Sequence, residues 1–237
     1  MRILYLIAIL FFTLSSCVKW LDVTPKDIVI EGEMFKNGEG FRNALNGIYR
    51  EMSSQSMYGK EMSWGMVDVM GQCYRTGTGI SSTNVYYQAG YDGVYTSDNS
   101  KGMISGMWSS TYNVIANCNN LIEKITKAEP KEFRGGNLEK EMILGEATAL
   151  RGFLHFDMLR LFGKAPVKGE NEMAIPYFTR FKSVFEPQKT TKEILDLVIA
   201  DLKKGRDLVI NFDTLTVDGV DRKTWMSRKF RFSEKWG

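Results

Sequence analysis

The chain contains 237 residues, of which 43% are hydrophobic and 25% charged, and its 31 Lys and Arg residues against 28 Asp and Glu residues give a formal net charge of +3. These proportions are typical of a globular protein and allow one domain or a compact pair of domains. No basic run stands out, so nucleic acid is not indicated as a partner.

The N-terminus has the order of an export signal. Met1 and Arg2 provide one positive charge, and residues 3–12 (ILYLIAILFF) form a short apolar run. This run is about half as long as a segment that crosses a ~30 Å hydrocarbon core, so we do not expect a stable transmembrane helix. The alternative is a buried helix of a globular domain, which would have no polar face at the very start of the chain.

The residues Leu14, Ser15, Ser16 and Cys17 resemble the lipobox of bacterial lipoproteins. In that class the Cys thiol receives a diacylglyceryl group, the signal is cleaved just before the Cys, and the new amine is acylated. The resemblance predicts a signal peptide over residues 1–16 and lipidation of Cys17, and several acyl chains together anchor a protein stably. The alternative is an ordinary secreted protein in which this Cys occurs by chance.

Apolar spacing predicts four amphipathic helices. They are expected over residues 41–52, 108–125, 138–162 and 191–202. The residues expected near the buried side of the third helix are Met142, Ala149, Phe153, Phe156 and Leu161. Gly163 and Pro166 end this helix, and Thr190 with Glu193 has the pattern of a capping box at the start of the fourth.

Two segments are predicted to be irregular. Residues 62–107 are rich in Gly, Ser, Thr, Tyr and Asn, and we expect them to be irregular with short helical pieces. The only hint of strand alternation lies near Val85–Tyr87. Residues 174–188 form a loop that contains Pro176 and Pro187. The predicted architecture is all-α, built from antiparallel helix pairs with long irregular loops, which often carry function.

Side chains in catalytic or metal-binding patterns are missing from the sequence. His155 is the only histidine and lies inside the third predicted helix, where a packed or surface role is far commoner than a catalytic one. No serine has the surroundings of a nucleophile elbow, and Asp157 and Arg160 are spaced for a local ion pair. We therefore expect no enzyme, no cofactor and no metal site.

Two cysteines remain after Cys17. An exported protein could pair Cys73 with Cys118 in a disulfide. Cys118 lies in a helical pattern, however, and a small buried side chain is the commoner role there.

A group of aromatic residues falls within the first irregular segment. Its members are Trp64, Tyr74, Tyr86, Tyr87, Tyr91 and Tyr95. Aromatic faces pack well on the C–H faces of sugar rings, and their polar tips help to fix orientation. The candidates for ligand binding are Trp64, Tyr74, Tyr86 and Tyr87; the alternative is that these side chains fill the core beneath a long loop.

Five blocks of the chain resemble, in the correct order, the SusD/RagB-like glycan-binding lipoproteins of the outer membrane. The blocks are the tether at 17–25 (CVKWLDVTP), 41–49 (FRNALNGIY), 108–119 (WSSTYNVIANCN), 145–166 (GEATALRGF, FDMLRLFG and Pro166), and Ile175–Pro176 with the 191–202 helix. The fourth block is the most specific. Each block alone is a weak signal, whereas five in order make chance similarity improbable.

The resemblance implies a scaffold like that of tetratricopeptide repeats and no catalysis. It implies a lipid-anchored protein at the outer membrane, facing outside, that captures an oligosaccharide or other nutrient and passes it to a TonB-dependent, SusC-like transporter. Family members are usually about twice this length or more, so we expect residues 17–237 to form an incomplete N-terminal helical domain. The alternative is a helical scaffold that docks on the transporter without binding glycan itself.

Overall fold

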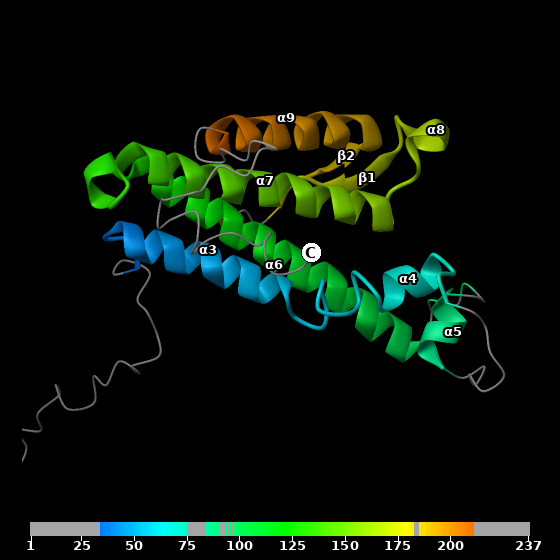
Figure 1. Cartoon of the computed structure of the whole chain (residues 1–237). Helices are drawn as coiled ribbons and strands as arrows, with labels where there is room; N and C mark the ends of the chain where they lie inside the picture. Colours follow the sequence, from blue (N-terminus) through cyan, green and yellow to red (C-terminus); the bar gives the residue numbers. More distant parts are fainter. Residues whose placement is uncertain are drawn as a thin grey trace, which may run out of the picture. The chain divides into compact units, whose positions relative to one another are not determined.

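A computed structural model of the chain describes residues 34–74, 84–90, 93, 95, 97–182 and 185–210. The predicted signal peptide, Cys17, Tyr91 and the segment after residue 210 lie outside the described residues. The elements below keep the labels shown in Figure 1.

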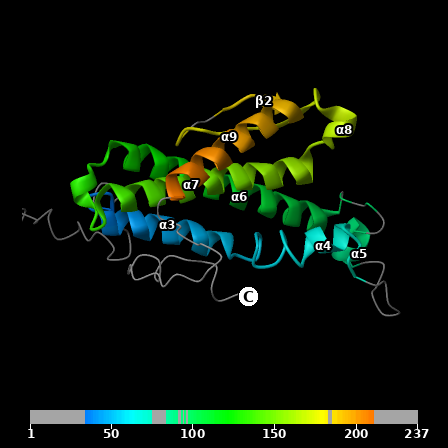
Figure 2. The same ribbon diagram turned by 45° about the horizontal axis from the view of Figure 1, so that its top comes forward.

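Four helices form the main body of the described structure (Figures 1 and 2). They are α3 (Gly38–Met52), α6 (Asp98–Lys127), α7 (Gly136–Phe162) and α9 (Thr191–Val209). Polar contacts of α3 advance in step along α7, so these two helices run in the same direction. Helix α6 runs opposite to α7, since Arg151 binds Asn119 whereas Lys140 binds the Ala128 carbonyl. The four predicted helices are therefore confirmed.

Side-chain caps explain where the predicted helices begin. The Asn37 side chain accepts the Gly40 N–H at the start of α3. Thr190 and Glu193 form the predicted capping box at the start of α9, because each side chain accepts the other residue's backbone N–H. Helix α7 ends at Phe162 with Gly163 as its C-cap, as the sequence predicts.

The segment 62–107 contains the short helical pieces that the sequence predicts, and in addition the first turns of α6. Helix α6 begins at Asp98 because the Ser97 side chain caps it and buried Met107 packs in the core, which outweighs the cost of Gly102 and Gly106 inside the helix. Two short helices precede it, α4 (Met66–Met70) and α5 (Val85–Gly90). The hint of a strand near Val85–Tyr87 is wrong, since the Asn84 side chain accepts the Tyr86 N–H and starts a helical turn.

Two short strands lie at the two ends of the predicted loop at 174–188. β1 (Met173–Pro176) pairs antiparallel with β2 (Gln188–Thr190), in a register that places Met173 opposite Thr190. The short 3-10 helix η2 (Pro130–Glu132) precedes α7, and the short helix α8 (Pro166–Gly169) precedes β1. Strands of three or four residues form only when they pair with a segment elsewhere in the chain, so a local sequence pattern does not reveal them.

The core has two parts. The larger gathers buried side chains from α3, the turns after it, α6 and α7. The smaller joins the C-terminal half of α7 to β1 and α9 through residues such as Met158, Ile175 and Ile194. Cys118 is buried in the larger part and Cys73 is exposed, and both are free thiols, so the disulfide alternative is wrong. Burial raises the pKa of the Cys118 thiol to about 12.

Helices α7 and α9 pack unusually closely because glycines face each other at their contact. A Cβ atom added at Gly205 would lie 2.7 Å from the Ala149 Cβ and 2.8 Å from the Gly145 carbonyl oxygen. A Cβ added at Gly145 would in turn lie 2.9 Å from the Gly205 carbonyl oxygen. The absence of these side chains lets the two backbones approach.

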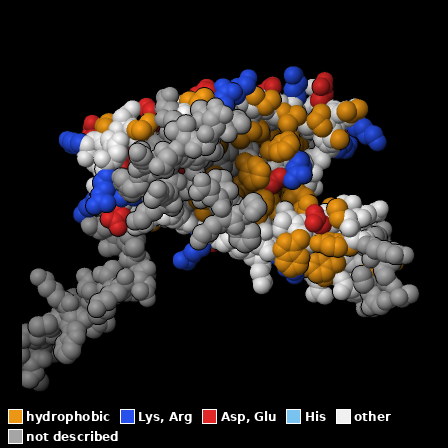
Figure 3. Space-filling model, viewed as in Figure 1, with side chains coloured by type: hydrophobic (Ala, Val, Ile, Leu, Met, Phe, Trp, Pro, Cys, Tyr) orange, Lys and Arg blue, Asp and Glu red, His pale blue; other side chains and the backbone are white. Residues whose placement is uncertain are grey.

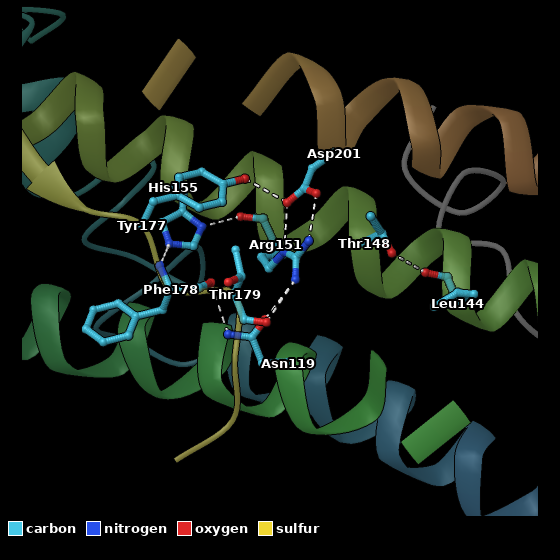
Figure 4. A network of polar contacts seen from close by, with 9 residues as sticks. All are labelled: Asn119, Leu144, Thr148, Arg151, His155, Tyr177, Phe178, Thr179 and Asp201. Carbon is cyan, nitrogen blue, oxygen red and sulfur yellow. Dashed lines mark hydrogen bonds and ion pairs between the residues drawn. The ribbon is translucent and has the colours of Figure 1, made fainter. Parts of the chain in front are cut away.

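A buried polar network joins α6, α7 and α9 (Figure 4). The Arg151 guanidinium forms a bidentate pair with Asp201, with its Nε and Nη2 atoms each 2.7 Å from a carboxylate oxygen. Its Nη1 atom donates to Asn119 Oδ1 at 3.1 Å, and the Tyr177 hydroxyl donates to Asp201 at 2.7 Å. The positive charge of buried Arg151 is therefore compensated by the Asp201 carboxylate and by the hydrogen bond to Asn119.

His155 belongs to the same network, so the prediction that it is a packed helix residue is confirmed. Its Nε2 atom accepts the Phe178 N–H at 3.1 Å, which leaves Nδ1 as the donor to the Arg151 carbonyl at 2.8 Å. Its ring stacks on Tyr177 with centroids 3.8 Å apart. Burial lowers the pKa of His155 to about 4, because the charged ring would lose its hydration.

Among the described residues, none of the helices combines the length and the apolar character that a membrane span requires.

The glycine contact gives a direct test of α7–α9 packing. We expect Gly205→Ala to lower the free energy of unfolding by about 1–3 kcal/mol, because the new methyl must displace Ala149 or the α7 backbone. The matched control is Gly47→Ala in α3, where nothing lies within 4 Å, and it should raise stability by roughly 0.8–1 kcal/mol. Urea unfolding of both variants measures the difference; equal effects would contradict the packing account.

The buried histidine makes stability depend on pH. An unfolded histidine titrates near pH 6.5, so between about pH 6.5 and 4 the unfolded state binds more protons than the folded state. Stability is therefore full above about pH 6.5 and should fall by roughly 3 kcal/mol as the pH drops to 4. Urea unfolding across this range should show a shallower slope for His155→Gln, and an unchanged slope would assign the acid sensitivity to other groups.

Candidate functional site

Two of the four predicted ligand-binding residues form an exposed aromatic pair. Trp64 is 56% exposed and Tyr74 is 43% exposed, and the Tyr74 hydroxyl donates to the Trp64 carbonyl oxygen. They flank α4, one before its first residue and one after its last. Their polar atoms bind backbone while a large part of each ring faces solvent, which is the arrangement that stacking on a ligand requires.

The turns between α3 and α4 hold Trp64 in place. The Trp64 Nε1–H donates to the Gly59 carbonyl at 3.1 Å, and the segment closes on itself through backbone bonds such as Gly65 N–H to Lys60 O at 2.7 Å. Met57 and Met62 from the same turns are buried in the core. The Trp64 indole is therefore held in a fixed position by turns that are packed into the core, so it loses little conformational entropy when it binds a ligand.

Tyr86 is placed differently. It is half-buried against the core, and its hydroxyl donates to Glu61 Oε1 at 2.8 Å while Lys60 lies 5.0 Å above its ring. Burial and the neighbouring Glu61 raise the pKa of Tyr86, with the hydrogen bond to Lys60 acting in the opposite direction. The other oxygen of Glu61 accepts the Met66 N–H at 3.3 Å, so this buried carboxylate joins α5 to the start of α4.

An apolar pocket of about 310 Å³ lies next to α4. Its lining comes from α4, α6, the end of α7 and the residue Tyr95, and consists of Met66, Met70, Tyr95, Ile104, Met107, Leu161 and Phe162. Methionine side chains adapt to irregular shapes, and a pocket of this size suits one small ring or one protruding side chain. No local sequence pattern reveals this pocket, because its walls come from α4, Tyr95, α6 and the end of α7, which are separated along the chain.

The structure thus separates the four predicted residues. Trp64 and Tyr74 lie together with much of their rings exposed, Tyr86 lies against the core with its hydroxyl bound, and Tyr87 is half-buried on α5. The alternative that these aromatics fill the core therefore describes Tyr86 better than Trp64. Ligand contact by any of the four stays a prediction.

The described residues carry no arrangement that suggests catalysis. They contain no group of three His, Cys, Asp or Glu side chains that could hold a metal ion. Asp157 binds Arg160, as its spacing predicts, and also accepts the Tyr58 hydroxyl at 2.6 Å. These carboxylate contacts serve packing within the scaffold.

Comparison with known proteins gives a consistent relationship. A SusD-like family model, described as "Starch-binding associating with outer membrane", matches residues 19–216. Two curated SusD-like proteins of Formosa agariphila are 26% identical over 205 residues and 22% identical over 200 residues, covering 86% and 84% of this chain. The chain spans 36% of the length of each of these relatives.

Solved structures agree with this relationship. A SusD superfamily protein from Bacteroides thetaiotaomicron is 27% identical with a TM-score of 0.57, over 73% of this chain and 37% of that protein. A protein described as a putative sugar binding protein from Bacteroides vulgatus is 26% identical with a TM-score of 0.56, over 72% and 36% of the two chains. The predicted fold, a mostly helical scaffold like that of tetratricopeptide repeats, is confirmed. The chain therefore belongs to the SusD-like family, whose members are carbohydrate-binding proteins associated with the outer membrane.

Proposed function

We propose that this chain acts as an outer-membrane lipoprotein that captures an oligosaccharide at the cell surface and passes it to a TonB-dependent transporter. Family membership supports glycan binding and the outer membrane as the location. The lipobox-like residues ending in Cys17 support a lipid anchor. The chain spans 36% of the length of its curated relatives, so the relationship alone does not carry capture and delivery over to this chain. The proposal for this chain therefore depends on the structural features described next.

The exposed pair of Trp64 and Tyr74 is the observation that carries the proposal. The apolar C–H face of a pyranose ring is flat and packs on an indole or phenol ring without directional bonds. Both rings are held by hydrogen bonds to backbone, so their positions are set before a ligand arrives. The neighbouring apolar pocket beside α4 offers further surface for an apolar face or substituent.

A lipid anchor would make a glycan site of low affinity sufficient for uptake. Several acyl chains hold a protein at the membrane, which keeps a bound oligosaccharide near a transporter at a high effective concentration. Modest affinity at the aromatic pair is then sufficient for capture. The proposed arrangement therefore requires stacking surfaces and an anchor, and it requires no catalytic group on this chain.

Replacing the exposed aromatics should weaken glycan binding. We expect Trp64→Ala and Tyr74→Ala in the mature chain each to reduce affinity for a bound polysaccharide about fivefold to tenfold, because each removes a stacking face worth roughly 1 kcal/mol. Affinity electrophoresis through gels that contain starch or other polysaccharides measures this change. Starch is the first choice because the matching family model is described as starch-binding.

A control makes this result specific. Phe185→Ala removes another exposed aromatic that is not one of the candidates, and it should leave affinity unchanged. A mature chain that is retarded by no polysaccharide, yet co-purifies with a transporter, would favour the scaffold alternative. Retardation that survives both alanine variants would place the glycan elsewhere on the chain.

Loss of Cys17 should release the protein from membranes. We expect Cys17→Ala to move the chain from the membrane fraction to the soluble fraction and to abolish labelling by radioactive palmitate, because the acceptor thiol is gone. Cys73→Ala is the matched control, since Cys73 is an exposed free thiol that should not carry lipid. Continued labelling of Cys17→Ala would contradict the anchor.

A further inference from the structure

A second pocket lies between α6 and the segment that follows β1. Its volume is about 250 Å³, and its walls come from one stretch of α6 and from residues 178–182. Aromatic rings, one amide and two cationic side chains line it, namely Tyr112, Phe178, Phe181, Asn119, Arg180 and Lys182. None of these residues belongs to the exposed aromatic pair, which lies in the turns on either side of α4.

Side chains of α6 and α7 hold the segment 178–182 in place. The Phe178 N–H donates to His155 Nε2 at 3.1 Å, and the Phe178 carbonyl accepts from Asn119 Nδ2 at 3.0 Å (Figure 4). The Phe181 N–H donates to Glu123 Oε1 at 2.7 Å. These bonds fix a segment that lies outside any helix or strand, so the pocket needs little ordering when a ligand enters.

The aromatic walls suit one sugar ring. The rings of Tyr112 and Phe178 meet edge to face with their centroids 5.5 Å apart, and the Tyr112 hydroxyl donates to the Pro176 carbonyl at 3.1 Å. A cavity of about 250 Å³ is small for a drug-sized ligand and matches a single ring with its substituents. The C–H faces of a pyranose pack well on aromatic rings.

The two cations add a preference for negative charge. The Arg180 side chain is 74% exposed and contacts Glu186 at 3.3 Å, a surface ion pair of the kind that contributes little to stability. Its guanidinium has five N–H donors, so it can bind an anion of the ligand as well. Lys182 Nζ lies 5.2 Å from the centre of the Phe181 ring. The nearby Glu123 carboxylate accepts the Phe181 N–H.

The backbone at Lys182 has an unusual conformation. Its φ angle is +58°, in the left-handed region that residues other than glycine rarely occupy. Such a conformation persists where the surrounding structure enforces it, and it is common at ligand sites. The turn at this position brings Lys182 to the same pocket as Arg180.

We propose that the pocket between α6 and residues 178–182 binds one anionic sugar ring, a pyranose that carries a carboxylate or a sulfate ester. The ring packs among Tyr112, Phe178 and Phe181, and its anionic group faces Arg180 and Lys182. The proposal rests on the proposed function for the class of ligand, and it adds a second site with a preference for charge.

NMR titration of the full mature chain with three glycosides tests the preference. Methyl β-glucuronide carries a carboxylate, methyl β-glucoside 6-sulfate carries a sulfate ester, and methyl β-glucoside carries neither. We expect a dissociation constant of about 1 mM for the better anion and roughly fivefold or more weaker binding of the neutral glucoside. The better anion identifies the group, and amide shifts at Phe178 and Phe181 identify the pocket. Equal binding of all three, or shifts only elsewhere, would overturn the proposal.

Charge variants test the role of the two cations. Arg180→Gln and Lys182→Gln should each weaken binding of the better anion about fivefold to tenfold and leave the neutral glucoside unchanged, because only charge is removed. Arg206→Gln is the matched control, since it neutralises another exposed arginine in a surface pair, here with Asp207 on α9. A preference for the anion that survives both pocket variants would overturn the proposal.

Aromatic variants test the walls of the pocket. Phe181→Ala should weaken all three glycosides about fivefold, because a stacking face is lost. Phe156→Ala is the control: Figure 3 shows hydrophobic side chains gathered over the region of α7 and α9, and Phe153 and Phe156 of α7 are 40% and 36% exposed. The expectation that these two residues lie near the buried side of α7 is therefore wrong. Equal effects of the Phe181 and Phe156 variants would contradict stacking in the pocket.

Starch gels separate this proposal from the proposed function. Starch retardation that depends on Trp64, together with no preference for either anionic glycoside, would overturn the second site and leave the proposed function standing. Selective binding of an anionic glycoside by a chain that no polysaccharide retards would support the pocket and contradict capture at Trp64.

Discussion

An ion pair buried between two helices sets the arrangement of this chain. The Arg151 guanidinium and the Asp201 carboxylate are taken out of water together, so each needs the other at a fixed distance and angle. Loss of either partner would leave a buried charge uncompensated, at a cost of about 3–5 kcal/mol. Asn119, Tyr177 and His155 complete the network, and α6, α7, α9 and the segment after β1 can satisfy it in only one register.

Close packing and the polar network support each other. Glycines at the α7–α9 contact bring the helix backbones together, and this approach places Asp201 within reach of Arg151. Phe153 of α7 and Leu202 of α9 are partly exposed, at 40% each. One helix contact therefore combines a buried polar network with large apolar side chains that remain partly exposed.

The candidate ligand site lies outside this network. It depends on the turns before α4, on buried Glu61, and on backbone bonds that hold Trp64 and Tyr74 with their rings exposed. A scaffold stabilised by distant helix contacts can tolerate changes in these turns, as is general for binding loops on rigid frameworks.

The sequence by itself determined the four main helices, the capping box that starts α9, the end of α7 and the family, because apolar periodicity, the Thr190–Glu193 pair and Gly163 act within a few residues of chain. It also identified Trp64 and Tyr74 as candidates, since aromatic residues in a Gly-rich segment are visible without a fold. Only the tertiary structure separated exposed Trp64 from Tyr86, paired β1 with β2, assembled the pocket beside α4, and left Phe153 and Phe156 exposed. Those outcomes depend on contacts between segments far apart in the chain, and the strength of such contacts is not encoded in any local pattern.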